Sequence, residues 1–292
     1  MLSLATMASH PLPLQQIARQ FHWCAPMHLP EVPFVGQLTT IDLNSDLGES
    51  FGRWTLGSDA ELMKVITSAN VACGYHAGDP GVMRSTVRLA RDAGVAVGAH
   101  PGLPDLAGFG RRNMAVSAEE VEDMVLYQVG ALAAIAACEG VRLQHVKPHG
   151  ALYNMAVKDR GLADAIARAV RAFDAGLVLF ALPGSGLEQA GCEAGLRVAR
   201  EGFADRAYEA DGSLTPRTRP GAVIHSPADV IGRAVRMARD GVVRATNGSD
   251  IPMRVDTICT HGDTPASHEL TRQLRAALEA DGIVMAPPRN AS

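Results

Sequence analysis

Short apolar runs rich in β-branched residues alternate with amphipathic segments from residue 39 onward. The runs that predict strands lie at residues 39–44, 68–74, 95–100, 143–148, 177–182, 196–201, 222–226 and 256–261. Segments with apolar residues at helical spacing lie at 59–66, 81–92, 159–173, 227–239 and 265–279, and another helix is predicted after the capping-box sequence at 117–120. Strand–helix alternation at this spacing is typical of a parallel sheet. This many units in one domain favour the α/β class, as a distorted β/α barrel of about seven parallel strands.

The first 38 residues do not share this pattern. They are rich in proline, and Glu31 is their one acidic residue. They fit a signal peptide poorly, because no basic segment precedes the apolar start and Pro11 and Pro13 interrupt it. We expect residues 1–38 to be a disordered extension without function, and residues 39–292 to form a single catalytic domain.

Polar side chains follow five of the predicted strands at the point where each strand ends, beside a glycine or a proline. Because the carboxyl ends of parallel strands meet on one face, where ligands bind, these side chains are predicted to converge. A single histidine after a strand is more often a structural residue than a catalytic one, but five such strand ends indicate an active site. The candidates are Asp46, Glu49, His76, Asp79, His100, Lys147, His149, His261 and Asp263.

Two arginines follow a glycine-rich turn in the sequence AGFGRR. Arg111 and Arg112 are candidates for an anion clamp, since a guanidinium binds a carboxylate or phosphate through two hydrogen bonds. A solvated surface pair is an equally good interpretation. The chain contains neither a P-loop motif nor a G-x-S-x-G nucleophile elbow.

Composition narrows the possible partners. The chain has 292 residues and a formal net charge of −4, with no basic run, so we expect neither nucleic acid nor a membrane as a partner. Its 5 cysteines are scattered and form no C-x-x-C pair, which indicates a reducing compartment and a cytoplasmic location.

The predicted cluster permits two kinds of hydrolysis, and the residue types alone leave both open. In one, histidine and aspartate bind a divalent metal that activates water. In the other, Asp46 or a histidine acts as a general base, while Lys147 and His149 stabilise developing negative charge.

Several long motifs in fixed order resemble those of the LamB/YcsF family. They are DLNSDLGESFG, SANVACGYHAGDP, AHPGLPDLAGFGRR, VKPHGALYN, GFADRAYEADGSL and ICTHGD, and the resemblance extends over residues 41–281. One departure is Ser45, where the family commonly has cysteine, so a thiol nucleophile at this position is not expected to be essential.

The resemblance implies a fold similar to that of polysaccharide deacetylases and glycoside hydrolases. It implies the role of the A subunit of an ATP-dependent 5-oxoprolinase, which converts 5-oxo-L-proline, ATP and water to L-glutamate, ADP and phosphate with subunits B and C as partners. It also implies that the nine strand-end candidates belong to the site. Two alternatives remain open: a metal-dependent deacetylase or amidohydrolase acting alone, and a non-catalytic subunit that binds the lactam.

Overall fold

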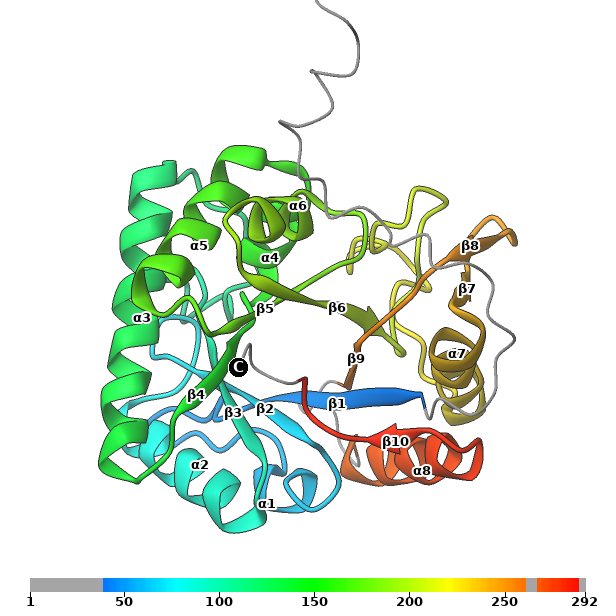
Figure 1. Cartoon of the computed structure of the whole chain (residues 1–292), viewed down its shortest axis with the longest axis horizontal. Helices are drawn as coiled ribbons and strands as arrows, with labels where there is room; N and C mark the ends of the chain where they lie inside the picture. Colours follow the sequence, from blue (N-terminus) through cyan, green and yellow to red (C-terminus); the bar gives the residue numbers. More distant parts are fainter. Residues whose placement is uncertain (1–38, 261–266, 289–292) are drawn as a thin grey trace, which may run out of the picture. The chain divides into compact units, whose positions relative to one another are not determined.

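Seven parallel strands close into a barrel in the computed structural model, which describes residues 39–260 and 267–288 (Figure 1). In order around the barrel they are β1 (Thr40–Leu47), β2 (Ser68–Ala72), β3 (Ala96–His100), β4 (Leu143–Val146), β5 (Val178–Ala181), β6 (Arg197–Phe203) and β9 (Thr257–Thr260). β9 pairs with both β6 and β1, which closes the ring, and the short β10 (Val284–Met285) pairs with the start of β1. The predicted barrel of about seven parallel strands is therefore confirmed, while the prediction for residues 1–38 lies outside the described residues.

Helices surround this barrel, as Figure 1 shows. They are α1 (Asp59–Leu62), α2 (Pro80–Ala93), α3 (Ala118–Cys138), α4 (Gly150–Lys158), α5 (Arg160–Phe173), α6 (Gly186–Glu193), α7 (Pro227–Asp240) and α8 (Ser267–Ala280). The predicted capping box is confirmed, because the Ser117 hydroxyl accepts from the Glu120 amide and the Glu120 carboxylate accepts from the Ser117 amide.

One predicted strand is wrong. Residues 222–226 form no barrel strand, and Val223 makes only an isolated bridge to Arg206. The segment is extended, but it pairs with the loop after β6, so β9 takes the next place in the barrel. An antiparallel pair that the sequence pattern did not predict, β7 (Val242–Arg244) and β8 (Asp250–Pro252), lies between α7 and β9 in the chain.

The barrel interior is polar along β1. Asp42, Asn44 and Asp46 alternate with other residues of the strand and are all buried. The Asp42 carboxylate accepts hydrogen bonds from Thr257 and from Ser68, at 2.5 and 2.7 Å. Burial raises the pKa of Asp42 to about 6, although these hydrogen bonds oppose the shift. These buried hydrogen bonds at Asp42 hold the first half of β1, the strand that carries Asp46, in place inside the barrel.

Helix α3 is the one helix in the described ranges that is long and apolar enough to cross a membrane. One face of it is buried, including Val121, Val125 and Leu132, and the helix packs along α5. Packing of this face against the rest of the barrel accounts for part of its apolar character, while Leu126 and Tyr127 of the same helix are exposed.

Gly98 on β3 leaves room for a histidine inside the barrel. A Cβ at this position would lie 2.1 Å from Nε2 of His145, which is buried and stacked on Phe180. We expect Gly98→Ala to lower the free energy of unfolding by about 1–3 kcal/mol, because the ring must move within a close-packed core. Chemical denaturation checks this value.

Gly130 in α3 provides the matched control for the Gly98 substitution. A Cβ there has no atom within 4 Å, so Gly130→Ala is expected to leave the protein as stable or to stabilise it by about 0.5–1 kcal/mol. Equal effects of the two substitutions would contradict the role given to Gly98.

Candidate active site

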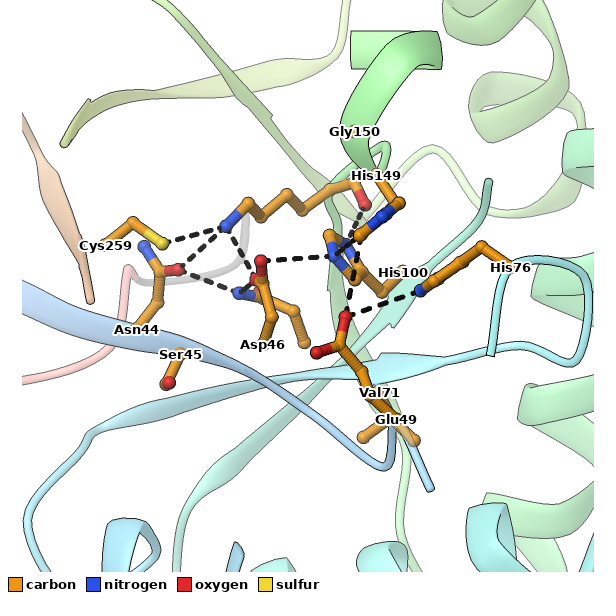
Figure 2. Close-up of polar contacts among 12 residues, drawn as sticks. Asn44, Ser45, Asp46, Glu49, Val71, His76, His100, His149, Gly150 and Cys259 are labelled. Atoms are coloured by element: carbon orange, nitrogen blue, oxygen red, sulfur yellow. Dashed lines mark hydrogen bonds and ion pairs between the residues drawn. The ribbon is translucent and has the colours of Figure 1, made fainter. Parts of the chain in front are cut away.

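Six of the predicted residues lie together at the carboxyl ends of the barrel strands, and Figure 2 labels all of them except Lys147. All six side chains are buried, and they come from the first four strands or the loops that follow them: Asp46, Glu49, His76, His100, Lys147 and His149. His261 and Asp263 lie outside the described residues, so their place in the site stays a prediction.

An ion pair crosses the barrel between Asp46 and Lys147. The Lys147 ammonium donates to Asp46 Oδ1 at 2.7 Å, and Asn70 Nδ2 donates to the same oxygen at 2.9 Å. The second oxygen, Oδ2, lies 3.4 Å from Nε2 of His100. Two donors on one oxygen hold the Asp46 carboxylate in a fixed orientation, with Oδ2 directed toward the histidines.

Lys147 is surrounded by acceptors. Besides Asp46, its ammonium lies 2.9 Å from Glu201 Oε1 and donates to Cys259 Sγ at 3.1 Å. Burial favours the neutral amine, but the neighbouring charges, first that of Asp46, outweigh it and raise the pKa of Lys147 well above its ordinary value. Lys147 is therefore a permanent cation, and its charge is directed at two carboxylates of the protein. This geometry favours a role in positioning Asp46 over the predicted role of stabilising negative charge that develops on a substrate.

Three histidines and Glu49 form a tight group beside Asp46. Glu49 Oε1 lies 3.5 Å from His76 Nε2 and 3.6 Å from His149 Nδ1, and His149 Nδ1 lies 2.9 Å from His100 Nε2. One ligand atom from each of the four residues lies within 4.8 Å of every other, so the group could hold a metal ion. Burial, and then the neighbouring imidazoles, lower the pKa values of His76 and His149 well below the ordinary value, which favours the neutral form of both rings.

The loop between β3 and α3 fixes the orientation of this group. Phe109 has a φ of 55°, in the left-handed region, and its carbonyl accepts a hydrogen bond from His149 Nε2 at 2.8 Å. The following Gly110 also has a positive φ, and a Cβ there would lie 2.6 Å from the Cβ of His76. Gly110 of the AGFGRR motif thus lets the loop approach the side chains of His76 and His149 closely.

A cavity of about 670 Å³ opens above the ion pair. Asp46, His100 and Lys147 are among the residues that line it, and Arg111, Lys158 and Arg217 add positive charge to its wall. Pockets of this size bind small molecules, and the cationic wall favours ligands with negative charge.

Two of the predicted site residues have other contacts in the structure. Asp79 caps α2, because its Oδ1 accepts from the amides of Gly81 and Val82, and those backbone hydrogen bonds lower its pKa. Arg112 forms an ion pair with the buried Asp105, and its own side chain is largely exposed. Of the two candidate arginines, Arg111 lines the cavity and Arg112 does not.

Sequence patterns did not identify several residues that hold the site. Asn70 and Glu201 lie on β2 and β6, and both contact the Asp46–Lys147 pair from inside the barrel. The sequence signal that could have identified them is a charged or amide residue within a predicted strand. The cavity-lining Arg206 was missed as well; its Nη2 donates to the Thr215 carbonyl at 2.7 Å and so fixes the loop after β6.

Ser45 has no position in the cavity wall. Its hydroxyl donates to the carbonyl of Thr260 at 2.7 Å and is fully buried. This agrees with the expectation that a nucleophile at this position is not essential. Burial also raises the pKa of Cys259 well above the ordinary value, so that thiol stays protonated and is a poor nucleophile.

Comparison with known proteins gives one consistent result. The family model described as LamB/YcsF family matches residues 41–292. A protein of Methylococcus capsulatus, named as the A subunit of 5-oxoprolinase, is 58% identical over 85% of this chain and 95% of its own length. Relatives with the same name from Pyrococcus furiosus and Bacillus subtilis are 56% and 53% identical, over 85% and 83% of this chain and 97% and 95% of their own lengths. The crystal structure of a lactam utilization protein from Thermus thermophilus superposes with a TM-score of 0.81 at 51% identity, covering 85% of this chain and 99% of that one.

Proposed function

This chain belongs to the LamB/YcsF family, and we propose that it is the A subunit of an ATP-dependent 5-oxoprolinase. The reaction converts 5-oxo-L-proline, ATP and water to L-glutamate, ADP and phosphate. The observation that carries the proposal is the near full-length similarity to relatives named as the A subunit of 5-oxoprolinase, at 53–58% identity. The buried Asp46–Lys147 pair in the lining of a cavity whose wall also carries Arg111 and Arg217 supports a hydrolytic role.

The cavity suits a small anionic lactam. 5-Oxoproline carries one carboxylate and one ring amide, both of which need polar partners. Arg111 lines the cavity and can pair with the carboxylate, while the ring carbonyl would lie near Asp46 and His100. Arg111 therefore takes the role that the sequence left open between Arg111 and Arg112.

Asp46 is assigned the proton transfer. Lys147 and Asn70 hold its Oδ1, so that Oδ2 can accept a proton from the attacking water. The water oxygen bonds to the ring carbonyl carbon, the carbon–nitrogen bond breaks, and the ring nitrogen takes up a proton to give the amine of glutamate. A lactam resists this attack, and transfer of the γ-phosphoryl group of ATP to the amide oxygen, with ADP as the leaving group, would make the ring carbon more electrophilic. Cleavage of the carbon–nitrogen bond would then leave an acyl phosphate, and a second water molecule would hydrolyse it to the carboxylate of glutamate and phosphate.

We assign ATP handling wholly or partly to partner subunits B and C. The chain has no P-loop, and the word subunit in the names of its relatives supports a complex. A cytoplasmic location is part of the same proposal, because the four cysteines in the described ranges are all free thiols.

Reconstitution tests the proposal. Glutamate formation from 5-oxoproline and ATP should require this chain together with subunits B and C, and should stop when any of the three is omitted. Glutamate formation by B and C without this chain would overturn the proposal.

The alternative of a metal-dependent amidohydrolase acting alone draws support from the Glu49–histidine group. It predicts amide hydrolysis by the isolated chain without ATP. A third possibility, a non-catalytic lactam-binding subunit, predicts full turnover after loss of the Asp46 carboxylate.

Arg111 provides a test of substrate contact. We expect Arg111→Gln to raise the KM for 5-oxoproline roughly 10- to 100-fold with a smaller effect on kcat, since a hydrogen bond to a charged group is worth about 1.5–3 kcal/mol. Steady-state kinetics of the reconstituted complex measure both constants. Arg112→Gln is the control, because Arg112 pairs with Asp105, and its KM should change by less than about threefold. A larger effect at Arg112 would reverse the assignment.

A further inference from the structure

Three separations within the Glu49–histidine group are close to those of ligands around one ion. Two atoms bound to a tetrahedral zinc ion at roughly 2.0–2.1 Å are roughly 3.3 Å apart. Glu49 Oε1 lies 3.5 Å from His76 Nε2 and 3.6 Å from His149 Nδ1, and the two nitrogens of His149 and His100 are 2.9 Å apart. All four side chains are buried, with the three rings 0–3% exposed, so ordinary solvent does not supply their partners.

The hydrogen bonds of two of the rings determine which nitrogens carry hydrogen. His100 Nδ1 lies 2.7 Å from the Lys147 carbonyl, and His149 Nε2 lies 2.8 Å from the Phe109 carbonyl. A carbonyl only accepts, so each of these nitrogens must be the N–H donor, and a neutral imidazole has only one. When both rings are neutral, the opposite nitrogens, His100 Nε2 and His149 Nδ1, direct lone pairs toward each other across 2.9 Å.

Facing lone pairs at this distance repel unless a proton or a metal cation lies between them. Metal-binding histidines commonly donate their other N–H to a backbone carbonyl, which is the arrangement of His100 and His149 here. His76 adds an independent observation, because neither of its ring nitrogens has a hydrogen-bond partner in the part of the chain that the structure describes. Figure 2 shows its ring beside Glu49 and directed toward the same group.

We propose that Glu49, His76, His100 and His149 bind one divalent transition-metal ion, and that zinc is the best-suited ion. Three imidazole nitrogens and one carboxylate oxygen are a donor set that zinc accepts, whereas calcium and magnesium prefer oxygen ligands. The rings of His76 and His149 are stacked, with 5° between their planes, so binding requires one of them to tilt. A Cβ at Gly102 would lie 2.6 Å from Nδ1 of His76, so this glycine lets the backbone lie close against the ring.

The ion would lie next to Asp46, since His100 Nε2 is 3.4 Å from Asp46 Oδ2. When bound, a divalent ion polarises a carbonyl group or lowers the pKa of a water molecule. The inference does not depend on which amide the site cleaves, because it rests on the protein's own ligands.

Metal binding by the full-length chain tests the proposal without an activity assay. The purified protein is stripped with a chelator, dialysed, and titrated with Zn²⁺ by calorimetry, and bound zinc is counted by elemental analysis. We expect one zinc per chain, and Co²⁺ in its place should give visible d–d bands of nitrogen and oxygen coordination. Glu49→Gln keeps the size of the side chain and should weaken zinc binding at least roughly tenfold, and His76→Asn should have a similar effect. Mutation of residues that only hydrogen-bond to metal ligands already lowers metal affinity roughly 10- to 100-fold, so loss of a ligand should cost at least as much.

The exposed His225 provides the control variant. His225→Gln should retain one zinc with unchanged affinity, and circular dichroism should show all variants to be folded. Zinc bound equally well by the wild type, Glu49→Gln and His76→Asn would overturn the proposal, as would a wild type that binds no zinc.

Discussion

Asp46→Asn is expected to abolish glutamate formation while the chain remains folded. Asparagine has the same shape and can still accept hydrogen bonds from Lys147 and Asn70, but it cannot take a proton from water. Loss of a general base typically costs roughly 10²–10⁴-fold, so we expect kcat to fall about 10³-fold or more. Glutamate release from 5-oxoproline and ATP in the reconstituted complex measures the loss, and thermal unfolding of the isolated variant shows whether it folds.

Asp79→Asn is the matched control for this substitution. It makes the same chemical change after the next strand, at the N-cap of α2, where asparagine caps as well as aspartate. We expect its activity to stay within about twofold of the wild type. If Asp46→Asn kept more than about a tenth of the activity, Asp46 would not be the proton-transfer group.

Lys147→Met is expected to have the largest effect on stability. Removal of the ammonium leaves Asp46 and Glu201 as buried carboxylates without their counter-charge. Breaking a buried ion pair by removing one partner costs about 3–5 kcal/mol, and we expect a loss of that size in the free energy of unfolding. Denaturant unfolding at neutral pH measures it.

The pH dependence of the wild type follows from the same ion pair. The pKa of Lys147 in the folded chain lies well above its ordinary value of 10.5. The contribution of Lys147 to the free energy of unfolding is therefore fully present below the pKa of the unfolded chain, and it is lost only as the pH rises through the pKa of the folded chain. Loss of the Lys147 contribution is therefore not expected at neutral or mildly alkaline pH.

Lys158→Met, at the exposed edge of the cavity, is the control for the Lys147 variant. We expect it to change the free energy of unfolding by no more than about 0.5 kcal/mol. A loss of less than about 1 kcal/mol in Lys147→Met would show that the ion pair does not hold the barrel interior together.

The barrel and much of the site could be predicted from local patterns. The alternation of strands and helices predicts a parallel sheet. In a parallel sheet the strand ends lie on one face, so residues at these ends, such as Asp46, His100 and Lys147, are expected to meet, and they do. The failure at 222–226 has a physical cause, since an extended apolar run does not reveal which partner it pairs with.

The roles of individual residues could not be predicted in the same way. Whether Lys147 faces a substrate or two carboxylates depends on Glu201, which lies on a distant strand and contacts it only after the barrel closes. The pairing of Arg112 with Asp105 likewise depends on the fold of the β3–α3 loop rather than on the AGFGRR motif itself. Such contacts follow from the closure of the sheet and of its loops, which sequence spacing does not encode.

The most direct measurement of the central claim is a crystal structure of this chain soaked with 5-oxoproline and, separately, with L-glutamate. We predict electron density for both ligands in the cavity, with the carboxylate of 5-oxoproline at Arg111 and its ring carbonyl near Asp46 and His100. Density for either ligand at a different place on the protein, with nothing bound above the Asp46–Lys147 pair, would contradict a lactam-cleaving centre at the mouth of the barrel.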